Sequence, residues 1–186
     1  MTVVWETERL LLRQFTEEDA EALLLLESDP EVMRHLGRAP LPDAGAYRLL
    51  IRTLFLPQYD RPGGFGAWAA VERTGGELVG GCGLKAAEST AHAAAMGFGP
   101  GEVEFGLALR RRSWGRGYAT ELIRALAHLA FERCGAARVV AGVSAANPAS
   151  ARAMEKAGLV RAEGEYFPPG LPGPCWKYAL SRDQRG

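Results

Sequence analysis

The chain has 186 residues, a length that fits a single domain over residues 1–186 with a substantial core. Its 22 basic and 22 acidic residues cancel, so its net charge gives no general attraction to nucleic acid. Hydrophobic residues make up 47% of the chain, but the apolar runs are much shorter than the roughly 20 residues of a membrane span. We therefore expect a globular protein with no nucleic-acid and no membrane partner.

The N-terminal residues and the cysteines indicate the cellular compartment of the protein. No basic segment leads into a long apolar stretch at the N-terminus, so we expect no signal peptide. Cys82, Cys134 and Cys175 are odd in number and far apart, without the paired spacing of metal ligands. We expect reduced thiols, no metal site and a cytoplasmic protein.

The first third of the chain alternates between strand-like and helix-like patterns. An opening strand is predicted over residues 7–14, and Thr16 then has the capping-box spacing to Asp19 that starts a helix reaching residue 27. Pro30 suits the first position of a short second helix. A third helix is predicted between Asp43 and Pro57, with four residues sharing its apolar face: Tyr47, Leu50, Ile51 and Leu54.

Glycine and proline residues mark the boundaries of the remaining predicted strands and helices. A hairpin is predicted from strands over residues 65–72 and 77–84, and residues 86–100 are predicted as a loop because they show no usable period. Near the C-terminus we expect a strand over residues 138–143 and a helix between Asn147 and Gly158, with Pro148 at its first position. Two closing strands are expected over residues 159–167 and 175–180.

The most informative stretch, residues 103–121, joins a strand to a long helix. Phe105, Leu107 and Leu109 alternate along one face, as in a half-buried strand. From Tyr118 onward the apolar residues instead follow a helical period. The two elements are therefore joined by a short turn that lies at the N-terminus of a helix.

That turn has the chemistry of an anion site. The first amides of a helix lack intrahelical partners, and the helix dipole is positive there. Gly115 and Gly117 let an anion approach the backbone, while Arg112 and Arg116 add fork-shaped donors. These residues indicate a phosphate or pyrophosphate site; the alternative is a tight strand-to-helix connection without a ligand. It is not a Walker loop, because no Gly-Lys-Ser/Thr follows.

Two motifs, in this order, resemble those of the GNAT superfamily of N-acetyltransferases. Arg112-x-x-Gly115-x-Gly117, followed by Tyr118-Ala-Thr-Glu, resembles the acyl-CoA pyrophosphate loop of that superfamily. Asn147-x-x-Ser150, followed by Glu155-Lys156-x-Gly158-Leu159, resembles its second motif. The opening Thr-Glu-Arg-Leu-Leu-Leu-Arg is similar to the branch of ribosomal-protein N-terminal (alanine/serine) acetyltransferases.

The resemblance implies an α+β fold, with a mixed, mostly antiparallel central sheet flanked by helices. It also implies acetyl-CoA as co-substrate, in a wedge where the strand containing Leu107 splays from the strand ending at Val143. The implied cofactor contacts are Leu107, Ala108, Leu109, Arg112, Trp114, Gly115, Arg116, Gly117, Tyr118, Ala119, Thr120 and Asn147.

The implied reaction is direct attack of an amine on the thioester. Glu104 is the candidate base, directly or through water, because it is a carboxylate in an apolar strand beside the expected thioester. Its alternative is an ion-paired glutamate without a catalytic role. His35, His92 and His128 show no partner pattern in the sequence, so we expect no catalytic role for any of them.

The leaving thiolate needs a proton or a hydrogen bond. Many superfamily members have a tyrosine seven residues after the asparagine, but Met154 stands there and has no proton to donate. Ser150 is the candidate that the resemblance offers, and its alternative is a residue that only bonds nearby backbone. Ser150 is therefore the second expected catalytic residue, after Glu104.

Three functions remain open at this stage. The first is an acetyl-CoA-dependent N-acetyltransferase acting on a protein or peptide N-terminus or on a small-molecule amine. The second is a non-catalytic acyl-CoA-binding module, and the third is a nucleotide-phosphate-binding protein. We expect the acceptor site to be built from residues 35–66, 86–100 and 168–174. The oligomeric state stays open, with a homodimer as one expectation because dimers are common in the resembled branch.

Overall fold

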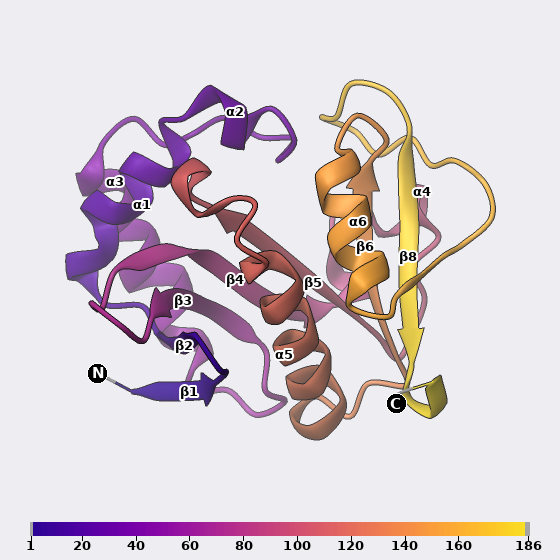
Figure 1. Cartoon of the computed structure of the whole chain (residues 1–186), viewed down its shortest axis with the longest axis horizontal. Helices are drawn as coiled ribbons and strands as arrows, with labels where there is room; N and C mark the ends of the chain where they lie inside the picture. The colour runs from indigo at the N-terminus through magenta and orange to yellow at the C-terminus, as the bar shows by residue number, and fades with distance from the viewer. Residues whose placement is uncertain (1, 185–186) are drawn as a thin grey trace.

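The computed structural model describes residues 2–184, which form an eight-stranded sheet with helices on both faces (Figure 1). The sheet order is β1-β2-β3-β4-β5-β6-β8-β7. The strands are β1 Val3–Glu6, β2 Leu10–Gln14, β3 Gly66–Glu72, β4 Leu78–Ala86, β5 Glu102–Leu109, β6 Arg138–Ser144, β7 Val160–Arg161 and β8 Cys175–Ser181. The α-helices are α1 Ala20–Glu27, α2 Pro30–Met33, α3 Ala44–Leu50, α4 Ala93–Met96, α5 Tyr118–Arg133 and α6 Pro148–Lys156. The expected mixed, mostly antiparallel α+β fold is confirmed.

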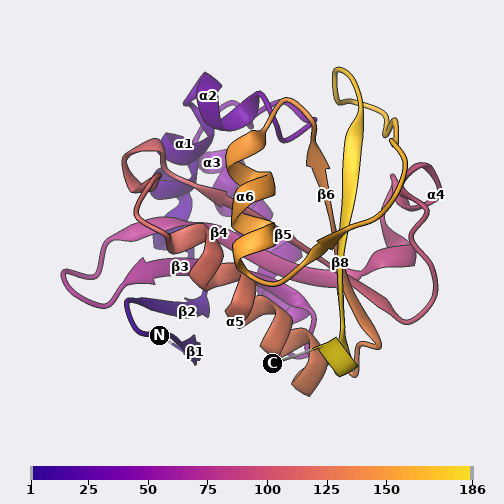
Figure 2. The ribbon, with the colours of Figure 1, turned by 45° about the vertical axis from the view of Figure 1, so that its right-hand side comes forward.

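The strands β5 and β6 form the one parallel pair among the described strands, and they pair only briefly. Their register runs from Glu102 opposite Arg138 to Glu104 opposite Val140 and then stops. Beyond that point β5 stays paired with β4 as far as Leu109, while β6 stays paired with β8. The two strands therefore splay apart as expected, and both views of the ribbon show β6 standing away from β5 (Figures 1 and 2).

A buried charge network closes the narrow end of this wedge. The carboxylate of Glu102 lies 3.1 Å from Lys177 Nζ on β8 and 3.2 Å from Arg138 Nη1 on β6. Both Glu102 and Lys177 are buried. Removing Glu102 would leave the buried charge of Lys177 without its carboxylate partner, so this network ties β5, β6 and β8 together where the strands begin to diverge.

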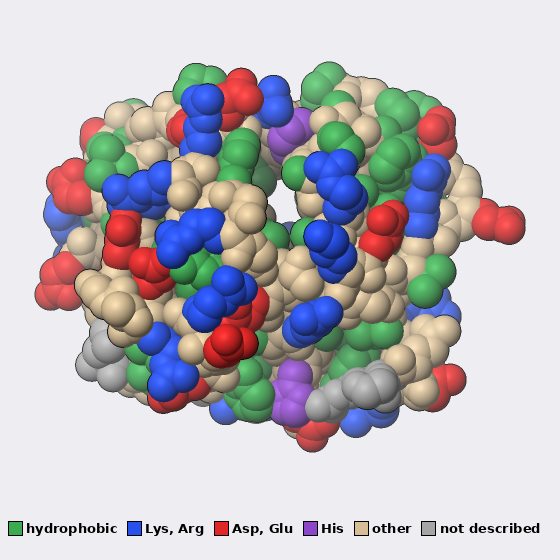
Figure 3. Space-filling model, in the orientation of Figure 1, with side chains coloured by type: hydrophobic (Ala, Val, Ile, Leu, Met, Phe, Trp, Pro, Cys, Tyr) green, Lys and Arg blue, Asp and Glu red, His purple; other side chains and the backbone are tan. Residues whose placement is uncertain are grey.

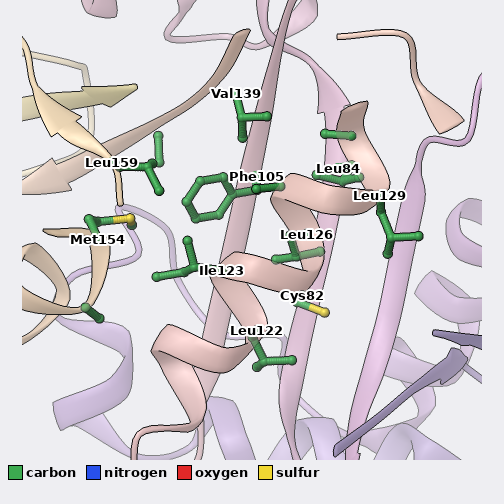
Figure 4. Close-up of a cluster of buried hydrophobic side chains, with 14 of the residues drawn as sticks. Cys82, Leu84, Phe105, Leu122, Ile123, Leu126, Leu129, Val139, Met154 and Leu159 are labelled. Atoms are coloured by element: carbon green, nitrogen blue, oxygen red, sulfur yellow. The ribbon is translucent and has the colours of Figure 1, made fainter. Parts of the chain in front are cut away.

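The helix α5 packs on one face of the sheet and supplies the largest core cluster. Leu122, Leu126 and Leu129 are buried and point toward the sheet, in one cluster with Phe105 of β5 (Figure 4). Their spacing of three and four residues is the period of one helical face. The helices α1 and α3 cover the opposite face, where Tyr47 is fully buried.

Most helices begin at the capping residues that the sequence predicts. The backbone N–H of Thr16 donates to the Asp19 carboxylate at 2.9 Å, before α1 begins. Asp29 and Asp43 accept backbone hydrogen bonds as the N-caps of α2 and α3. Among residues 2–184, no helix has both the length and the apolar character needed to cross a bilayer.

Three expected elements differ from the structure. The opening strand is a hairpin of β1 and β2, because the Thr7 hydroxyl exchanges hydrogen bonds with the backbone of Leu10 and makes a turn there. Leu54 is 49% exposed instead of buried, because a π-turn over Ile51–Phe55 rotates it off the apolar face of α3. The strand expected over residues 159–167 is reduced to β7, because Gly164 has a φ of +93°, outside the strand region.

The segment predicted as a loop after β4 holds more structure than expected. It contains a 3₁₀ turn over Ala87–Ser89 and the single turn of α4. Met96 and Phe98 are buried in a separate small cluster against β6 and β8. This anchoring brings the segment, including His92, to the narrow end of the wedge.

Candidate active site

A cleft of about 1640 Å³ opens where β5 and β6 separate. Its walls come from the free edges of both strands, from the 110–117 turn with the start of α5, and from the start of α6. Figure 3 shows it as an opening between the 110–117 turn and α6, with Lys and Arg side chains on both sides. The edge of β5 beyond Glu104 has backbone groups without a partner strand on this side.

The shape of the glycine turn depends on the φ angles of its two glycines. Gly115 and Gly117 have φ values of +73° and +81°, in the left-handed region that glycine tolerates best. A side-chain carbon at Gly115 would meet nothing within 4 Å, whereas one at Gly117 would lie 3.3 Å from Arg9 Nη2. The turn therefore presents open backbone at the N-terminus of a 16-residue helix.

The predicted cofactor contacts divide into two groups. Most of them line the cleft: Leu107, Ala108, Leu109, Trp114, Gly115, Gly117, Tyr118, Ala119, Thr120 and Asn147. Arg112 and Arg116 stand apart from the described lining and are paired with carboxylates of the β3–β4 hairpin. Arg116 Nη2 lies 2.7 Å from Glu72 Oε1, and Arg112 is ion-paired with Glu77.

Glu72 also accepts a hydrogen bond from the Tyr118 hydroxyl. That bond, followed by the charge of Arg116, lowers the pKa of Glu72. The same bond raises the pKa of Tyr118. Arg116 is thus already paired with a carboxylate before any anion arrives.

The turn between β1 and β2 packs over the start of α5, which the sequence did not predict. Glu121 of α5 accepts hydrogen bonds from the Thr7 hydroxyl at 2.6 Å and from the Arg9 backbone at 2.9 Å. Arg9 Nη1 also donates to the carbonyl of Arg116 at 2.8 Å. Burial alone would raise the pKa of Glu121, but the hydrogen bonds from Thr7 and Arg9 outweigh it, and the pKa is lowered.

The start of α6 forms the opposite wall. The Asn147 side chain caps the helix, with Oδ1 accepting from the Ser150 backbone N–H at 3.1 Å. Asn147 and Ser150 both line the cleft. Met154 is buried within the core cluster that includes Ile123 and Leu159 (Figure 4), so its sulfur replaces the expected tyrosine hydroxyl with an apolar group.

Glu104 lies at the narrow end of the cleft, at the last position where β5 pairs with β6. Its side chain is 9% exposed, and its Oε1 lies 2.8 Å from His92 Nε2. Lys85 Nζ of β4 lies 3.3 Å from its Oε2. The expectation that His92 has no carboxylate partner is therefore wrong. No pattern in the sequence predicts this contact, because the two residues are 12 positions apart across a segment without a period.

Another part of the cleft wall contains segments expected to bind the acceptor. Cleft-lining residues come from residues 31–38, from Leu50, Phe55 and Gln58, and from Pro168, Pro169 and Leu171. Its charges are already paired: Glu27 lies 2.5 Å from Arg38, and Glu31 lies 3.0 Å from Arg34. Burial, followed by the charge of Arg34, lowers the pKa of His35 on this wall.

Comparison with known proteins gives consistent matches. YoaA, an uncharacterized N-acetyltransferase of Bacillus subtilis strain 168, is 31% identical over 159 residues, or 86% of this chain and 84% of that protein. A GNAT-family acetyltransferase from Bacillus anthracis has a TM-score of 0.76 at 22% identity, over 98% of this chain and 99% of that one. The spermidine N-acetyltransferase of Vibrio cholerae, solved with CoA and spermine, has a TM-score of 0.73 at 17% identity, over 96% and 98%.

The family model described as the acetyltransferase (GNAT) domain matches residues 9–160. That region includes both strands of the wedge, the glycine turn and the whole of α6. The solved structures below 25% identity add agreement in fold alone. With its fold, its cleft and this match in accord, the chain belongs to the GNAT family of acetyltransferases.

Proposed function

We propose that the protein transfers acetyl from acetyl-CoA directly to a primary amine, with both substrates bound at once. The observation that carries this proposal is the separation of β5 from β6 after Glu104. It leaves strand-edge N–H and C=O groups lining an internal cleft, where an extended ligand with amide groups would satisfy them. The family match supports acetyl-CoA as that ligand.

The proposed position of acetyl-CoA follows the cleft wall. Its diphosphate would lie at Gly115, Gly117 and the first amides of α5, where an anion meets unpaired N–H groups and the positive end of the dipole. Its pantetheine amides would bond along Leu107–Leu109 and reach Asn147. Arg112 and Arg116 would contribute only after releasing their carboxylate partners, so the backbone carries more of the affinity.

The acceptor amine has to lose a proton before it can attack. For an α-amino group with a pKa of about 8, deprotonation at pH 7 costs about 1.4 kcal/mol, against nearly 5 kcal/mol for a lysine at about 10.4. Glu104, buried at the narrow end with His92 and Lys85 beside it, is the centre of the proposed proton-accepting site. The smaller cost of deprotonation favours an α-amino group over a lysine as the acceptor.

The leaving thiolate would be met from α6. Ser150 lines the cleft, and its backbone N–H, not its hydroxyl, is used by the Asn147 cap. We propose that the hydroxyl hydrogen-bonds the sulfur as negative charge develops on it. Met154 offers no proton at the position two turns into the helix.

Within the family, the acceptor class is an N-terminal amine of a peptide or protein, or a small-molecule amine. A putative ribosomal-protein-serine acetyltransferase of Vibrio cholerae shares the fold at 19% identity and a TM-score of 0.69, over 97% of this chain and 99% of that one. The spermidine enzyme has a small polyamine as its acceptor. A cytoplasmic location and a homodimer belong to this proposal as well.

Two measurements test the proposal. Titration calorimetry with acetyl-CoA, CoA and ATP should show binding of the first two and not of ATP. A panel of peptides beginning with Ser or Ala, spermidine and an aminoglycoside, read by release of the CoA thiol, should then reveal turnover. Binding of acetyl-CoA without turnover on any amine would favour a non-catalytic acyl-CoA-binding module. Binding of ATP instead would point to a nucleotide-phosphate site.

A further inference from the structure

His92 and Glu104 form a hydrogen-bonded pair at the narrow end of the cleft. Nε2 of His92 lies 2.8 Å from Oε1 of Glu104. The glutamate side chain is 9% exposed, whereas the imidazole is 30% exposed. Both residues line the cleft, so the imidazole is the member of the pair that a ligand reaches more easily.

The pairing determines which ring nitrogen is free. An ionised carboxylate only accepts hydrogen bonds, so Nε2 carries the hydrogen that Glu104 receives. A neutral imidazole with hydrogen on Nε2 has its lone pair on Nδ1. Catalytic triads use the same division, in which a carboxylate orients an imidazole that takes the proton.

Glu104 is less well placed to take the proton itself. A proton on this carboxylate would weaken its attraction to Lys85, 3.3 Å from Oε2, and would disturb the hydrogen bond from His92. Its Oε2 is buried and makes no hydrogen bond among the described residues, so it is the competing acceptor. A test therefore has to separate His92 Nδ1 from Glu104 Oε2.

We propose that His92 is a catalytic base of the transfer reaction and that Glu104 is its positioning residue, an inference that rests on the proposed function. Nδ1 takes one proton from the acceptor ammonium, and the neutral nitrogen then forms a bond to the thioester carbonyl carbon. Collapse of the tetrahedral intermediate breaks the C–S bond, and the electron pair leaves with sulfur. The second surplus proton of the nitrogen neutralises the thiolate, and His92 returns its proton to solvent.

The surroundings of His92 hold the ring in place. Phe98 packs edge-on against it, with ring centroids 5.8 Å apart. Lys177 of β8 lies 5.2 Å from the Phe98 ring and donates to the Gly97 carbonyl at 2.7 Å, which anchors the segment. Among the described residues, the charged groups on the imidazole side are thus Glu104 from β5, with Lys85 of β4 paired to it, and Lys177 beyond Phe98. The helix α4 itself contributes only Ala and Met.

The first experiment needs no acceptor. Nitrogen NMR on histidine-labelled protein, with the His92 signal assigned by its loss in His92→Gln, reports which ring nitrogen carries hydrogen. We expect hydrogen on Nε2 in the neutral ring, with Nδ1 taking up the second hydrogen as the pH is lowered. The opposite tautomer, or an Nδ1 that takes up no hydrogen on acidification, would overturn the proposal.

The second experiment measures kcat/KM for the best amine of the panel as a function of pH. His92→Gln can still donate to Glu104 but cannot take up a proton, so its loss should be about 10²–10³-fold near pH 7. The loss should shrink as pH rises past the pKa of the amine, because solvent then supplies the neutral nucleophile. His128→Gln, which removes an imidazole from α5 instead, should keep the wild-type pH profile.

The Glu104→Gln variant separates the two acceptors. If His92 is the base, kcat/KM of this variant still falls as the pH is lowered and the imidazole takes up a proton. If Glu104 is the base, that fall disappears in Glu104→Gln and persists in His92→Gln, which would overturn the proposal. A pH-independent loss in His92→Gln would also overturn it. Failure of the proposed function looks different, because the wild-type protein would then transfer acetyl to no amine of the panel.

Discussion

Arg9, in the turn between β1 and β2, and Glu121, in the first turn of α5, form an ion pair of 2.6 Å although 112 residues separate them. The same carboxylate accepts from the Thr7 hydroxyl and from the Arg9 backbone. The N-terminal hairpin is thereby fastened to the helix end that presents its amides to the cleft. Alignment of the proposed diphosphate site thus depends on a contact made by the first strands of the sheet.

The first prediction is that Glu121→Ala destabilises the fold. Thr7 and the Arg9 backbone would lose their acceptor, a loss that typically costs about 1–3 kcal/mol in the free energy of unfolding. Urea denaturation at pH 7 measures this difference. Glu8→Ala, at an exposed position of the same turn, should change the stability by less than about 0.5 kcal/mol. An equal effect of the two variants would contradict the prediction.

The same contact gives a pH dependence. Because the pKa of Glu121 is lowered in the folded protein, its stabilisation is complete above the unfolded pKa, about 4.3 for a glutamate. It is lost as pH falls through the folded pKa. The stability difference between the wild type and Glu121→Gln should therefore be present at pH 7 and vanish under acidic conditions; a difference that persists there would indicate a packing effect.

The second prediction concerns the glycine turn. Gly117→Val should abolish measurable acetyl-CoA binding in calorimetry, because a β-branched side chain at a φ of +81° is strained and fills the anion's approach. Gly135→Val is the matched control. Its φ is +65°, a side-chain carbon there meets nothing within 4 Å, and it lies just beyond the far end of α5. Similar loss of stability in both variants, with loss of affinity only in Gly117→Val, is the expected outcome.

The sequence predicted those features of the fold that residues close together in the chain determine. The strand that ends at Leu109 and the helix that begins at Tyr118 were both predicted, because alternation and helical period lie within a few residues. The positive φ values of Gly115 and Gly117 were not predicted. The splay of β5 from β6 followed only from the family resemblance. The residue pattern by itself does not predict that two parallel strands separate after three paired residues.

The features that were missed depend on the tertiary structure. His92 meets Glu104 because Met96 and Phe98 anchor an otherwise irregular segment, and nothing in its own sequence encodes that anchoring. Leu54 loses its place on the apolar face through one π-turn, which shifts the period by a residue. The ion pairs of Arg112 and Arg116 arise from a hairpin about 40 residues earlier in the chain.

The third prediction separates the two roles of Asn147. Asn147→Asp keeps an N-cap oxygen for the Ser150 backbone N–H, and its charge is favourable at a helix start. It removes the amide NH₂ group that would donate to pantetheine. The melting temperature should therefore stay near the wild-type value while acetyl-CoA affinity falls about tenfold, the effect of losing roughly one hydrogen bond. Asn147→Ala should lower both, and unchanged affinity in Asn147→Asp would restrict Asn147 to capping.

The fourth prediction follows from the neutralised arginines. If Arg112 binds phosphate after leaving Glu77, then Glu77→Gln should tighten acetyl-CoA binding several-fold at low ionic strength, because a competing charge is removed. Salt should erase the gain, since both side chains are exposed. The gain should also be absent when Glu77→Gln is combined with Arg112→Ala. A gain that survives in the double variant would mean that Arg112 is not a phosphate ligand.

The fifth prediction tests the leaving-group contact. Ser150→Ala removes the hydroxyl but keeps the backbone N–H that Asn147 caps, so α6 should begin as before and the melting temperature should hardly change. A contact that strengthens only as thiolate forms contributes to kcat and not to ground-state binding. We therefore expect kcat to fall about tenfold or more with acetyl-CoA affinity unchanged, corresponding to roughly 1.4 kcal/mol in the barrier. Single-turnover rates with the best amine of the panel measure the chemical step apart from product release. A Ser150→Ala variant with wild-type single-turnover rates would leave the thiolate to be protonated by solvent, and a fall in affinity equal to the fall in kcat/KM would make Ser150 a binding residue.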